Sequence, residues 1–356
     1  MAKKRVAVLF GGASKDYDVS LRSAYSALCG LSKAKYDVIP VGITRAGRWL
    51  YFPGNYSAIA SREWEADSDC CSAVLSPDPL HGGLIKLMGD DDSQGVNPYS
   101  LQRIDTVFSL LHGKYGECGQ IQALCKLSGI GYVGSDFSAA NACSDEMLTH
   151  LILDKAGIKT AKYYYMERVD IDGVEEKFGD IEAGISYPMY VKAASCSTSI
   201  GANAARTREE LKAGIKIAFS HHHKIIIEEQ LNGRELECIV WGSVYALNVS
   251  AVAEIKGGEE KKSKYVLKSP GLSIPADIDE SVAKEIEGAA KTAFLALGCK
   301  NFARVCFKLT ENGLYCRKVG NVTGLTENGI FALLMKESGY SYPELLDMVI
   351  DSAKEN

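Results

Sequence analysis

The sequence lacks any run of about 20 apolar residues, the length that spans a bilayer, and it lacks an excess of charge of either sign. Its 40 Lys and Arg residues stand against 45 Asp and Glu residues, which gives a formal net charge of −5 over 356 residues. This near-balance provides no electrostatic reason for binding nucleic acid or an anionic membrane. We therefore expect neither partner, while a local basic site for a small acidic ligand stays open.

The sequence also lacks a disulfide pattern, although it contains 11 cysteines. The number is odd, the chain is large, and the only adjacent pair is Cys70 and Cys71, so reduced thiols are the better interpretation. The N-terminal Met-Ala-Lys-Lys-Arg leads into an apolar strand rather than into a signal-peptide core. Together these features predict a cytoplasmic protein.

The first half of the chain has the order of a doubly wound α/β domain. A continuous apolar run at 6–10 precedes a glycine turn and a segment with helical spacing, which is the usual start of such a domain. The stretch 53–100 is polar and poorly periodic, and we expect a peripheral excursion there rather than core. The patterns predict further strands at 36–43, 104–111 and 131–133 and helices at 119–127 and 138–156.

The second half changes character, and mixed sheets in an α+β arrangement fit it. Strand-like runs alternate with loops and helices, and no internal repeat is present. We expect strands at 163–166, 187–192, 225–229 and 236–245 and a helix at 280–297.

Two glycine-containing loops follow predicted strands, Gly11-Gly12 and the segment 112–117 (HGKYGE). Open α/β sheets bind ligands at the carboxyl ends of their strands, so each loop is a candidate site. Glycines also serve tight turns, and either loop taken alone is equally consistent with a turn.

Six motifs follow one another along the whole chain: 11–20 (GGASKDYDVS), 112–117, Lys192 with 198–201 (TSIG), 228–235 (EEQLNGRE), Lys264-Tyr265 and Arg304-Val305. Their order and spacing resemble those of the D-alanine:D-alanine ligases. Within that family the chain looks closest to the D-alanine:D-serine type of vancomycin resistance, because of the segment 39–45 (IPVGITR) and the Asp-Tyr-Asp form of the first loop.

The resemblance implies an α/β N-terminal domain plus a two-part α+β ATP-grasp fold, with domains at 1–136, 137–220 and 221–356. It implies an ATP-dependent ligase for peptidoglycan precursors, in which ATP phosphorylates the carboxylate of a first D-alanine. The amine of a second D-amino acid then attacks the acylphosphate. ATP and Mg²⁺ are the cofactors that the family implies, and a homodimer stays open.

The resemblance also implies roles for individual residues, since phosphate oxygens need lysines and backbone N–H groups. Asp16 would face the ammonium of the first amino acid, where the family carries Glu, and Arg304 would stabilise negative charge on the intermediate. The catalytic set is Asp16, Ser20, Thr198 and Arg304, and the substrate set is His112, Tyr265 and Gly324. The ATP set is Lys192, Ser199, Glu228, Gln230, Leu231, Glu235 and Lys264.

The chain departs from the family at the positions that hold Mg²⁺, where carboxylates and an asparagine are expected. Cys306, Lys318 and Gly320 occupy these positions. Cysteine is a soft ligand, glycine has no side chain, and lysine brings a positive charge, so none suits Mg²⁺. In addition, Glu146 stands where the family carries a phosphate-binding lysine. We therefore expect no metal ligands at these positions.

Two functions stay open at this point. The chain is either a D-alanine:D-amino acid ligase with altered metal handling, or a non-catalytic relative that binds a nucleotide, a D-amino acid or a partner protein as a regulator. For the first function, one hypothesis is that Lys318, alone or together with Arg317, places a positive charge in the vacated metal site and neutralises phosphate without Mg²⁺. The alternative is that Lys318 and Arg317 both point to solvent.

Overall fold

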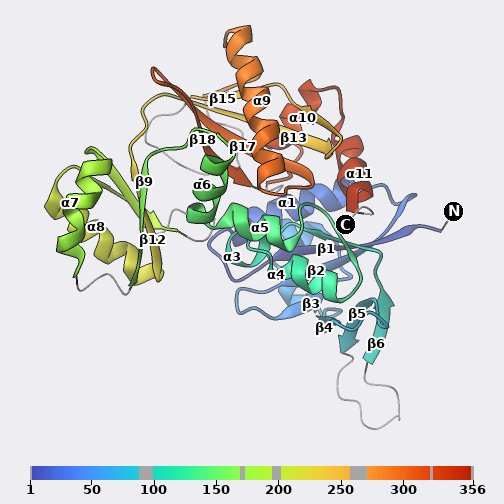
Figure 1. Cartoon of the computed structure of the whole chain (residues 1–356). Helices are drawn as coiled ribbons and strands as arrows, with labels where there is room; N and C mark the ends of the chain where they lie inside the picture. Colours follow the sequence, from blue (N-terminus) through green and yellow to red (C-terminus); the bar gives the residue numbers. More distant parts are fainter. Residues whose placement is uncertain are drawn as a thin grey trace.

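The computed structural model describes residues 2–87, 99–168, 173–194, 202–256, 271–320 and 324–353, without the side chains of Lys114 and Tyr115. Its strands form three sheets, each with its own helices (Figure 1). The predicted order, an α/β N-terminal part followed by two α+β parts, is confirmed. Within the described part, no helix has the length and apolarity needed to cross a membrane.

The N-terminal sheet has 8 strands in the order β6-β5-β4-β3-β2-β1-β7-β8. Pairing is parallel among β2, β1, β7 and β8, as expected for a buried sheet, and antiparallel from β2 outward to β6. The strands are β1 (Lys4–Gly11), β2 (Tyr36–Ile43), β3 (Trp49–Tyr51), β4 (Cys71–Leu75), β5 (Gly83–Leu87), β6 (Tyr99–Arg103), β7 (Thr106–Ser109) and β8 (Gly131–Tyr132). The helices are α1 (Tyr17–Gly30), α2 (Ser57–Ser61), α3 (Lys114–Glu117) and α4 (Gln120–Leu127), with a 3₁₀ turn at Trp64–Ala66.

The prediction that 53–100 lies outside the core is wrong for its described part. Strands β4 to β6 extend the sheet, and Trp64 is fully buried. The Trp64 ring lies 5.0 Å from that of Phe10 and 6.2 Å from that of Phe52, and its indole N–H donates to the Tyr17 hydroxyl at 3.1 Å. One large aromatic side chain therefore anchors a polar segment to the core.

The second sheet has 4 antiparallel strands in the order β11-β10-β12-β9 and forms the small lobe on the left of Figure 1. Residues of α7 and α8 form one apolar cluster with the sheet. The elements are β9 (Tyr163–Glu167), α7 (Val174–Gly184), β10 (Met189–Ala193), β11 (Asn203–Ala205), α8 (Arg208–His221) and β12 (Lys224–Glu229).

The third sheet, 6-stranded, has the order β16-β15-β13-β17-β18, with β14 paired to β13. All strand pairs described for the second and third sheets are antiparallel, so the prediction of mixed sheets is wrong for the described part of this half. Helix α9 packs its buried face on β13, β17 and β18. The elements are β13 (Arg234–Ser243), β14 (Ala246–Val249), β15 (Ala253–Ile255), β16 (Leu272–Ser273), α9 (Glu280–Ala296), β17 (Asn301–Thr310), β18 (Gly313–Gly320), α10 (Ile330–Glu337) and α11 (Tyr342–Ser352).

The single helix predicted at 138–156 is two helices, α5 (Phe137–Ser144) and α6 (Glu146–Lys155). Asp145 between them has an extended backbone, and its carboxylate accepts from the N–H groups of Met147 and Leu148 at 3.0 and 3.2 Å. Aspartate satisfies the otherwise unpaired N–H groups of a helix start, so the chain turns and begins a new helix. Glu146 therefore stands at the start of α6, where it pairs with Lys192 of the small lobe.

Candidate functional site

The first strand ends in a glycine turn. Gly11 and Gly12 have φ of +88° and +97°, and a Cβ on Gly11 would lie 2.2 Å from the carbonyl oxygen of Ile43. Ser20 is fully buried, and its hydroxyl accepts from the Gly11 N–H at 2.8 Å and donates to the Leu110 carbonyl at 2.7 Å. Through these two hydrogen bonds Ser20, on α1, connects the end of β1 to the segment that follows β7.

Asp16 and the loop that begins at His112 come together at the carboxyl ends of β1 and β7. A Cβ on Gly113 would lie 3.5 Å from the Asp16 carboxylate. His112 is buried with Nδ1 3.8 Å from Glu117 Oε1, and that oxygen also accepts from the Gly113 N–H at 3.2 Å. This edge is where open α/β sheets bind ligands, and the structure brings Asp16 and the His112 loop together there.

A cluster of charged side chains joins α6 to the small sheet. The Lys192 ammonium on β10 pairs with Glu146 on α6 and with Glu228 on β12, the latter at 2.5 Å. The other oxygen of Glu228 lies 2.6 Å from His150 Nε2. Only 16% of the Lys192 side chain and 13% of the Glu228 side chain is exposed. The charges therefore act with little solvent screening.

Their pKa values follow from this packing. Burial alone would lower the pKa of Lys192, but the charges of Glu146 and Glu228 outweigh it and hold the pKa above its ordinary value. Burial would raise the pKa of Glu228, but the Lys192 ammonium and the hydrogen bond from His150 bring it well below its ordinary value. Both groups are therefore charged at neutral pH.

The adjoining face of the third sheet carries cross-strand rows of charge. The Glu235 carboxylate on β13 forms ion pairs with Lys308 on β17 at 3.3 Å and with Arg317 on β18 at 3.0 Å, both through Oε1. Glu235 and Lys308 are paired across β13 and β17 and therefore share a face, and the ion pair with Glu235 brings the Arg317 side chain to the same side of the sheet.

The next row contains two of the three positions at which the family carries Mg²⁺ ligands and this sequence predicts none. Glu237, Cys306 and Lys318 are paired across β13, β17 and β18, and the Cys306 thiol lies 3.7 Å from Glu237 Oε2. Two residues before Cys306 on β17, Arg304 opposes Gly320 and lies 3.8 Å from that same Glu237 oxygen. Within the described ranges, no group of three or more His, Cys, Asp or Glu side chains is placed to hold a metal ion.

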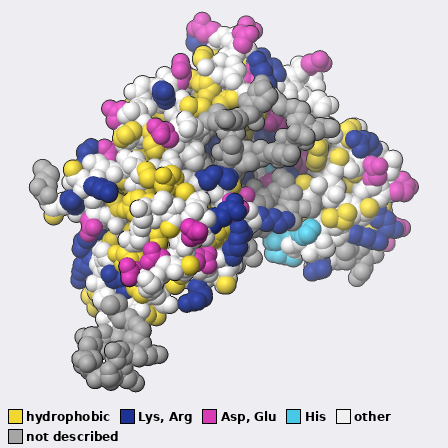
Figure 2. Space-filling model, turned by 180° about the vertical axis from the view of Figure 1, so that it is seen from behind, with side chains coloured by type: hydrophobic (Ala, Val, Ile, Leu, Met, Phe, Trp, Pro, Cys, Tyr) yellow, Lys and Arg dark blue, Asp and Glu magenta, His cyan; other side chains and the backbone are white. Residues whose placement is uncertain are grey.

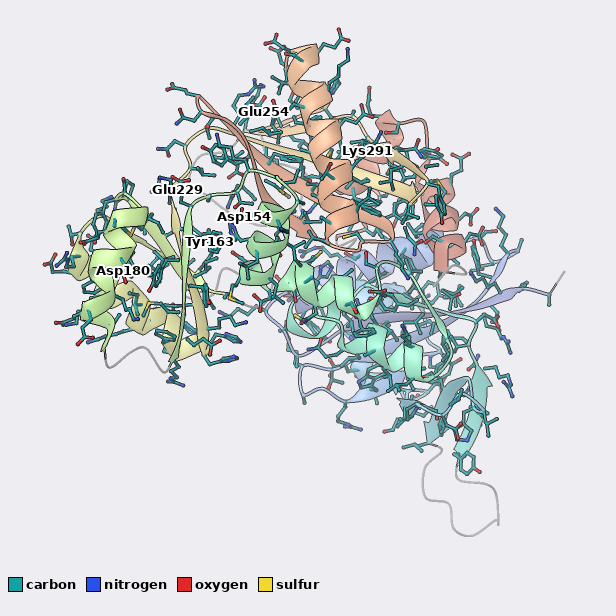
Figure 3. The ribbon with its side chains drawn as sticks, viewed as in Figure 1. Asp154, Tyr163, Asp180, Glu229, Glu254 and Lys291 are labelled. Atoms are coloured by element: carbon teal, nitrogen blue, oxygen red, sulfur yellow. The ribbon has the colours of Figure 1, made fainter. Side chains whose placement is uncertain are left out.

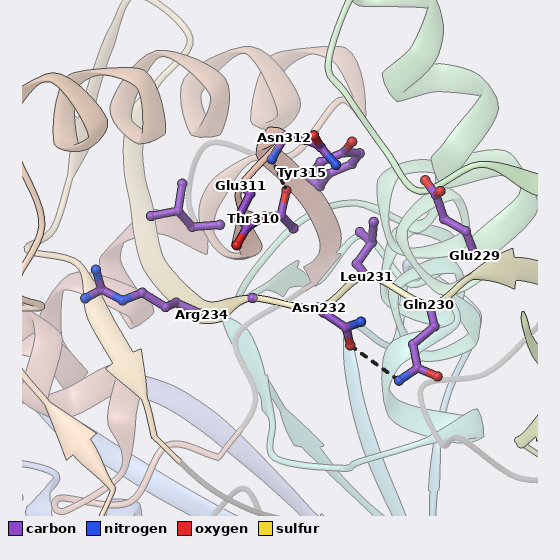
Figure 4. A pocket seen from close by; sticks show the side chains of 11 residues that line it. Glu229, Gln230, Leu231, Asn232, Arg234, Thr310, Glu311, Asn312 and Tyr315 are labelled. Carbon is purple, nitrogen blue, oxygen red and sulfur yellow. Dashed lines mark hydrogen bonds between the residues drawn. The ribbon is translucent and has the colours of Figure 1, made fainter. Parts of the chain in front are cut away.

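Two adjoining cavities lie where the small lobe meets the third sheet. One encloses about 240 Å³ and is lined by His150, Lys192, Glu228 and Glu235, together with Lys308 and Arg317. The other, about 730 Å³, lies on the outer side of the β12–β13 connection, where Gln230 Nε2 donates to Asn232 Oδ1 at 3.4 Å (Figure 4). Leu231 lines both. Basic side chains gather where the lobe meets the body of the protein (Figure 2).

Asp154 at the end of α6 and Tyr163 at the start of β9 lie side by side (Figure 3). Burial and the hydrogen bond to Asp154 raise the pKa of Tyr163 to about 12. The Tyr163 ring stacks 4.5 Å from that of His150. This contact packs α6, which carries the cavity-lining His150, against β9.

The remaining predicted residues divide into two groups. Thr198, Ser199, Lys264 and Tyr265 lie outside the described residues. Gly324, with φ +71°, begins the segment whose Leu325 is buried in the core shared with α1, and the next residues approach α1 through a 2.9 Å bond from the Glu327 N–H to Ser26. The structure thus brings Gly324 toward the N-terminal domain.

Sequence reasoning missed Glu237, His150 and Lys308. The only signal for Glu237 was an acid inside an apolar run, Leu236 to Val240. Its Oε1 atom is buried without a hydrogen-bond partner among the described residues, which is uncommon for a carboxylate. His150 and Lys308 had no sequence signal, because only the packing of α6 and the pairing of β17 bring them to the cavity.

Comparisons with known proteins cover nearly the whole chain. Residues 5–135 match the model described as D-ala D-ala ligase N-terminus, and residues 152–351 match D-ala D-ala ligase C-terminus. The chain is 38% identical to a D-alanine--D-alanine ligase of Acetivibrio thermocellus, over 99% of this chain and 96% of that protein. It is 33% identical to the vancomycin/teicoplanin A-type resistance protein VanA of Enterococcus faecium, over 98% of each.

A solved structure agrees with these matches. The VanG D-Ala:D-Ser ligase from Enterococcus faecalis superposes with a TM-score of 0.87 at 33% identity, over 99% of this chain and 100% of that chain.

Proposed function

Because the chain belongs to the D-alanine–D-alanine ligase family, we propose that it carries out ATP-dependent ligation of D-alanine to a second D-amino acid for peptidoglycan precursors. The observation that carries the proposal is the charged cavity between the small lobe and the third sheet, with Lys192 and Lys308 in its walls. Arg304 lies further along β17, on the same face of the third sheet as Lys308. In this proposal the second amino acid is D-serine, as the likeness to the Enterococcus faecalis structure suggests.

The family uses ATP and Mg²⁺, and the described residues fit the two differently. The cavity of about 240 Å³ offers Glu228, Gln230, Leu231 and Glu235 to an adenosine and Lys192 to phosphate. ATP would supply the phosphoryl group that activates the carboxylate. Asp16 and His112 at the strand ends would hold the first amino acid, with Ser20 fixing the turn beside them. Arg304 would face negative charge on the intermediate.

The positions expected to hold Mg²⁺ do not fit it. The row Glu237–Cys306–Lys318 contributes one carboxylate, which already faces Arg304, and Lys318 brings a cation into the row. We propose that Lys318 takes over charge neutralisation there, so nucleotide binding is independent of Mg²⁺. An ATP affinity that still requires millimolar Mg²⁺ would overturn this part of the proposal.

The same row favours a second function. A chain that has lost carboxylates at catalytic positions but keeps its nucleotide cavity could act as a non-catalytic binding or regulatory relative. Purified protein with ATP, Mg²⁺ and D-alanine, monitored for ADP, separates the two. ADP release that depends on D-alanine supports the ligase, whereas nucleotide binding without ADP release supports the binding protein.

A further inference from the structure

Glu146 is held beside the Lys192 ammonium by the backbone as well as by its charge. The Glu146 N–H donates to the carbonyl of Ala194 at 2.7 Å, which attaches the start of α6 to the residue that follows β10. Asp145 caps the same helix and pairs with Lys224 on β12 at 2.9 Å. The start of α6 thus holds the Glu146 side chain beside Lys192, which lines the cavity.

The charges around Lys192 do not leave its ammonium free. Glu146 and Glu228 carry two negative charges against the one positive charge of Lys192, and His150 already faces Glu228. Lys224 on β12 is paired with Asp145, and the two other cations that line the cavity, Lys308 and Arg317, both pair with Glu235. A ligand that brings several negative charges to Lys192 must therefore displace the Glu146 carboxylate or meet its repulsion.

An uncharged ligand in the same cavity meets no such repulsion. Glu229, Gln230 and Leu231 line the part of the cavity formed by the β12–β13 connection. A nucleoside can use these groups without touching Lys192. Selectivity between a nucleoside and its phosphorylated forms then depends on whether Lys192 is available.

We propose that Glu146 is a specificity-determining residue, an internal carboxylate that competes with ligand phosphate for Lys192 and weakens the binding of nucleoside polyphosphates relative to the bare nucleoside. This inference rests on the proposed nucleotide site and concerns how that site selects among its ligands. Removing the charge of Glu146 leaves Lys192 paired with Glu228 alone, which makes its ammonium available to phosphate.

The test uses calorimetric titration of the full chain with adenosine, ADP and ATP, for the natural protein and for Glu146→Gln and Glu146→Ala. The matched control is Glu182→Gln, which removes the same charge from an ion pair with Arg208 on the far helices of the small lobe. In the Glu146 variants the affinity for ATP relative to adenosine should rise by about tenfold, equivalent to about 1.4 kcal/mol, and ADP should show a smaller rise. The control should leave the ratio unchanged.

The possible failures are distinguishable. If adenosine and ATP both bind and their ratio is the same in all variants, the inference is overturned while the nucleotide site stands. If no variant binds any of the three ligands, although each unfolds cooperatively near the temperature of the natural protein, the proposed nucleotide site is overturned as well. Two different replacements of Glu146 guard against a folding defect peculiar to one of them.

Discussion

Replacing Lys192 with methionine should destabilise the protein by an amount that depends on pH. Methionine keeps the length of the side chain but removes the ammonium that lies between Glu146 and Glu228. Removing one partner of a buried ion pair costs about 3–5 kcal/mol, because the remaining charge is left uncompensated. Since 30% of the Glu146 side chain is exposed, we expect about 2–4 kcal/mol at pH 7.

The pH dependence follows from the direction of the pKa shift of Glu228. That pKa is lowered in the folded protein, so the ion pairs stabilise the fold above the ordinary carboxyl pKa of about 4.3, and this stabilisation is lost as the pH falls through the lower folded value. In Lys192→Met the cation that lowers the pKa is absent. The difference in unfolding free energy between the two proteins should therefore be largest near pH 7 and should shrink as the pH falls below about 4.

Urea unfolding followed by circular dichroism at several pH values measures this difference. Lys212→Met is the matched control, because Lys212 pairs with Glu175 at a site where 40% and 67% of the two side chains are exposed. Such exposed pairs contribute little to stability, so the control should change the midpoint far less. Equal effects of the two substitutions, or a Lys192 effect that is constant from pH 7 to pH 3, would refute the reasoning.

Two further substitution experiments follow from the structure. Gly42→Ala should cost about 1–3 kcal/mol of unfolding free energy, because its Cβ would lie 2.2 Å from the ring of the buried Trp64. Gly288→Ala, in α9 with nothing within 4 Å of the added Cβ, should instead stabilise by up to about 1 kcal/mol in the same urea titration. The double substitution Cys306→Asp with Lys318→Glu replaces a thiol and a cation by hard oxygen ligands, so ATP affinity should become at least tenfold stronger with added Mg²⁺. A calorimetric titration with and without Mg²⁺ would contradict this if it showed equal affinities.

Local patterns predicted the start of the fold well. The apolar run at 6–10, the glycines after it and the helical spacing beyond correspond to β1, the turn and α1. These are consequences of sequence neighbours, since a buried parallel strand needs apolar residues throughout and a tight turn needs positive φ. Asp145 was readable in principle as a helix cap, but the apolar spacing on both sides of it predicted one continuous helix.

Contacts between distant segments were harder to predict. Trp64 belongs to a stretch that is polar by composition, and only the approach of β1 and β3 shows that the stretch contributes to the core. The pairing of Lys192 with Glu146 is another contact that the sequence alone did not predict. Each residue could be singled out from the family resemblance, but their contact depends on how α6 is joined to β10.

The row of residues on the third sheet shows why the candidate site needed a structure. Side chains alternate along a strand, so the neighbours Arg317 and Lys318 would be expected on opposite faces of β18. The register of β17 and β18 shifts between Cys306 and Phe307, where β18 carries one extra residue. Arg317 consequently reaches Glu235 and lines the cavity, while Lys318 still opposes Cys306 in the neighbouring row. The extra residue thus brings a second basic side chain to the side of the sheet that carries Lys318, an arrangement that the alternation of side chains along a strand does not predict.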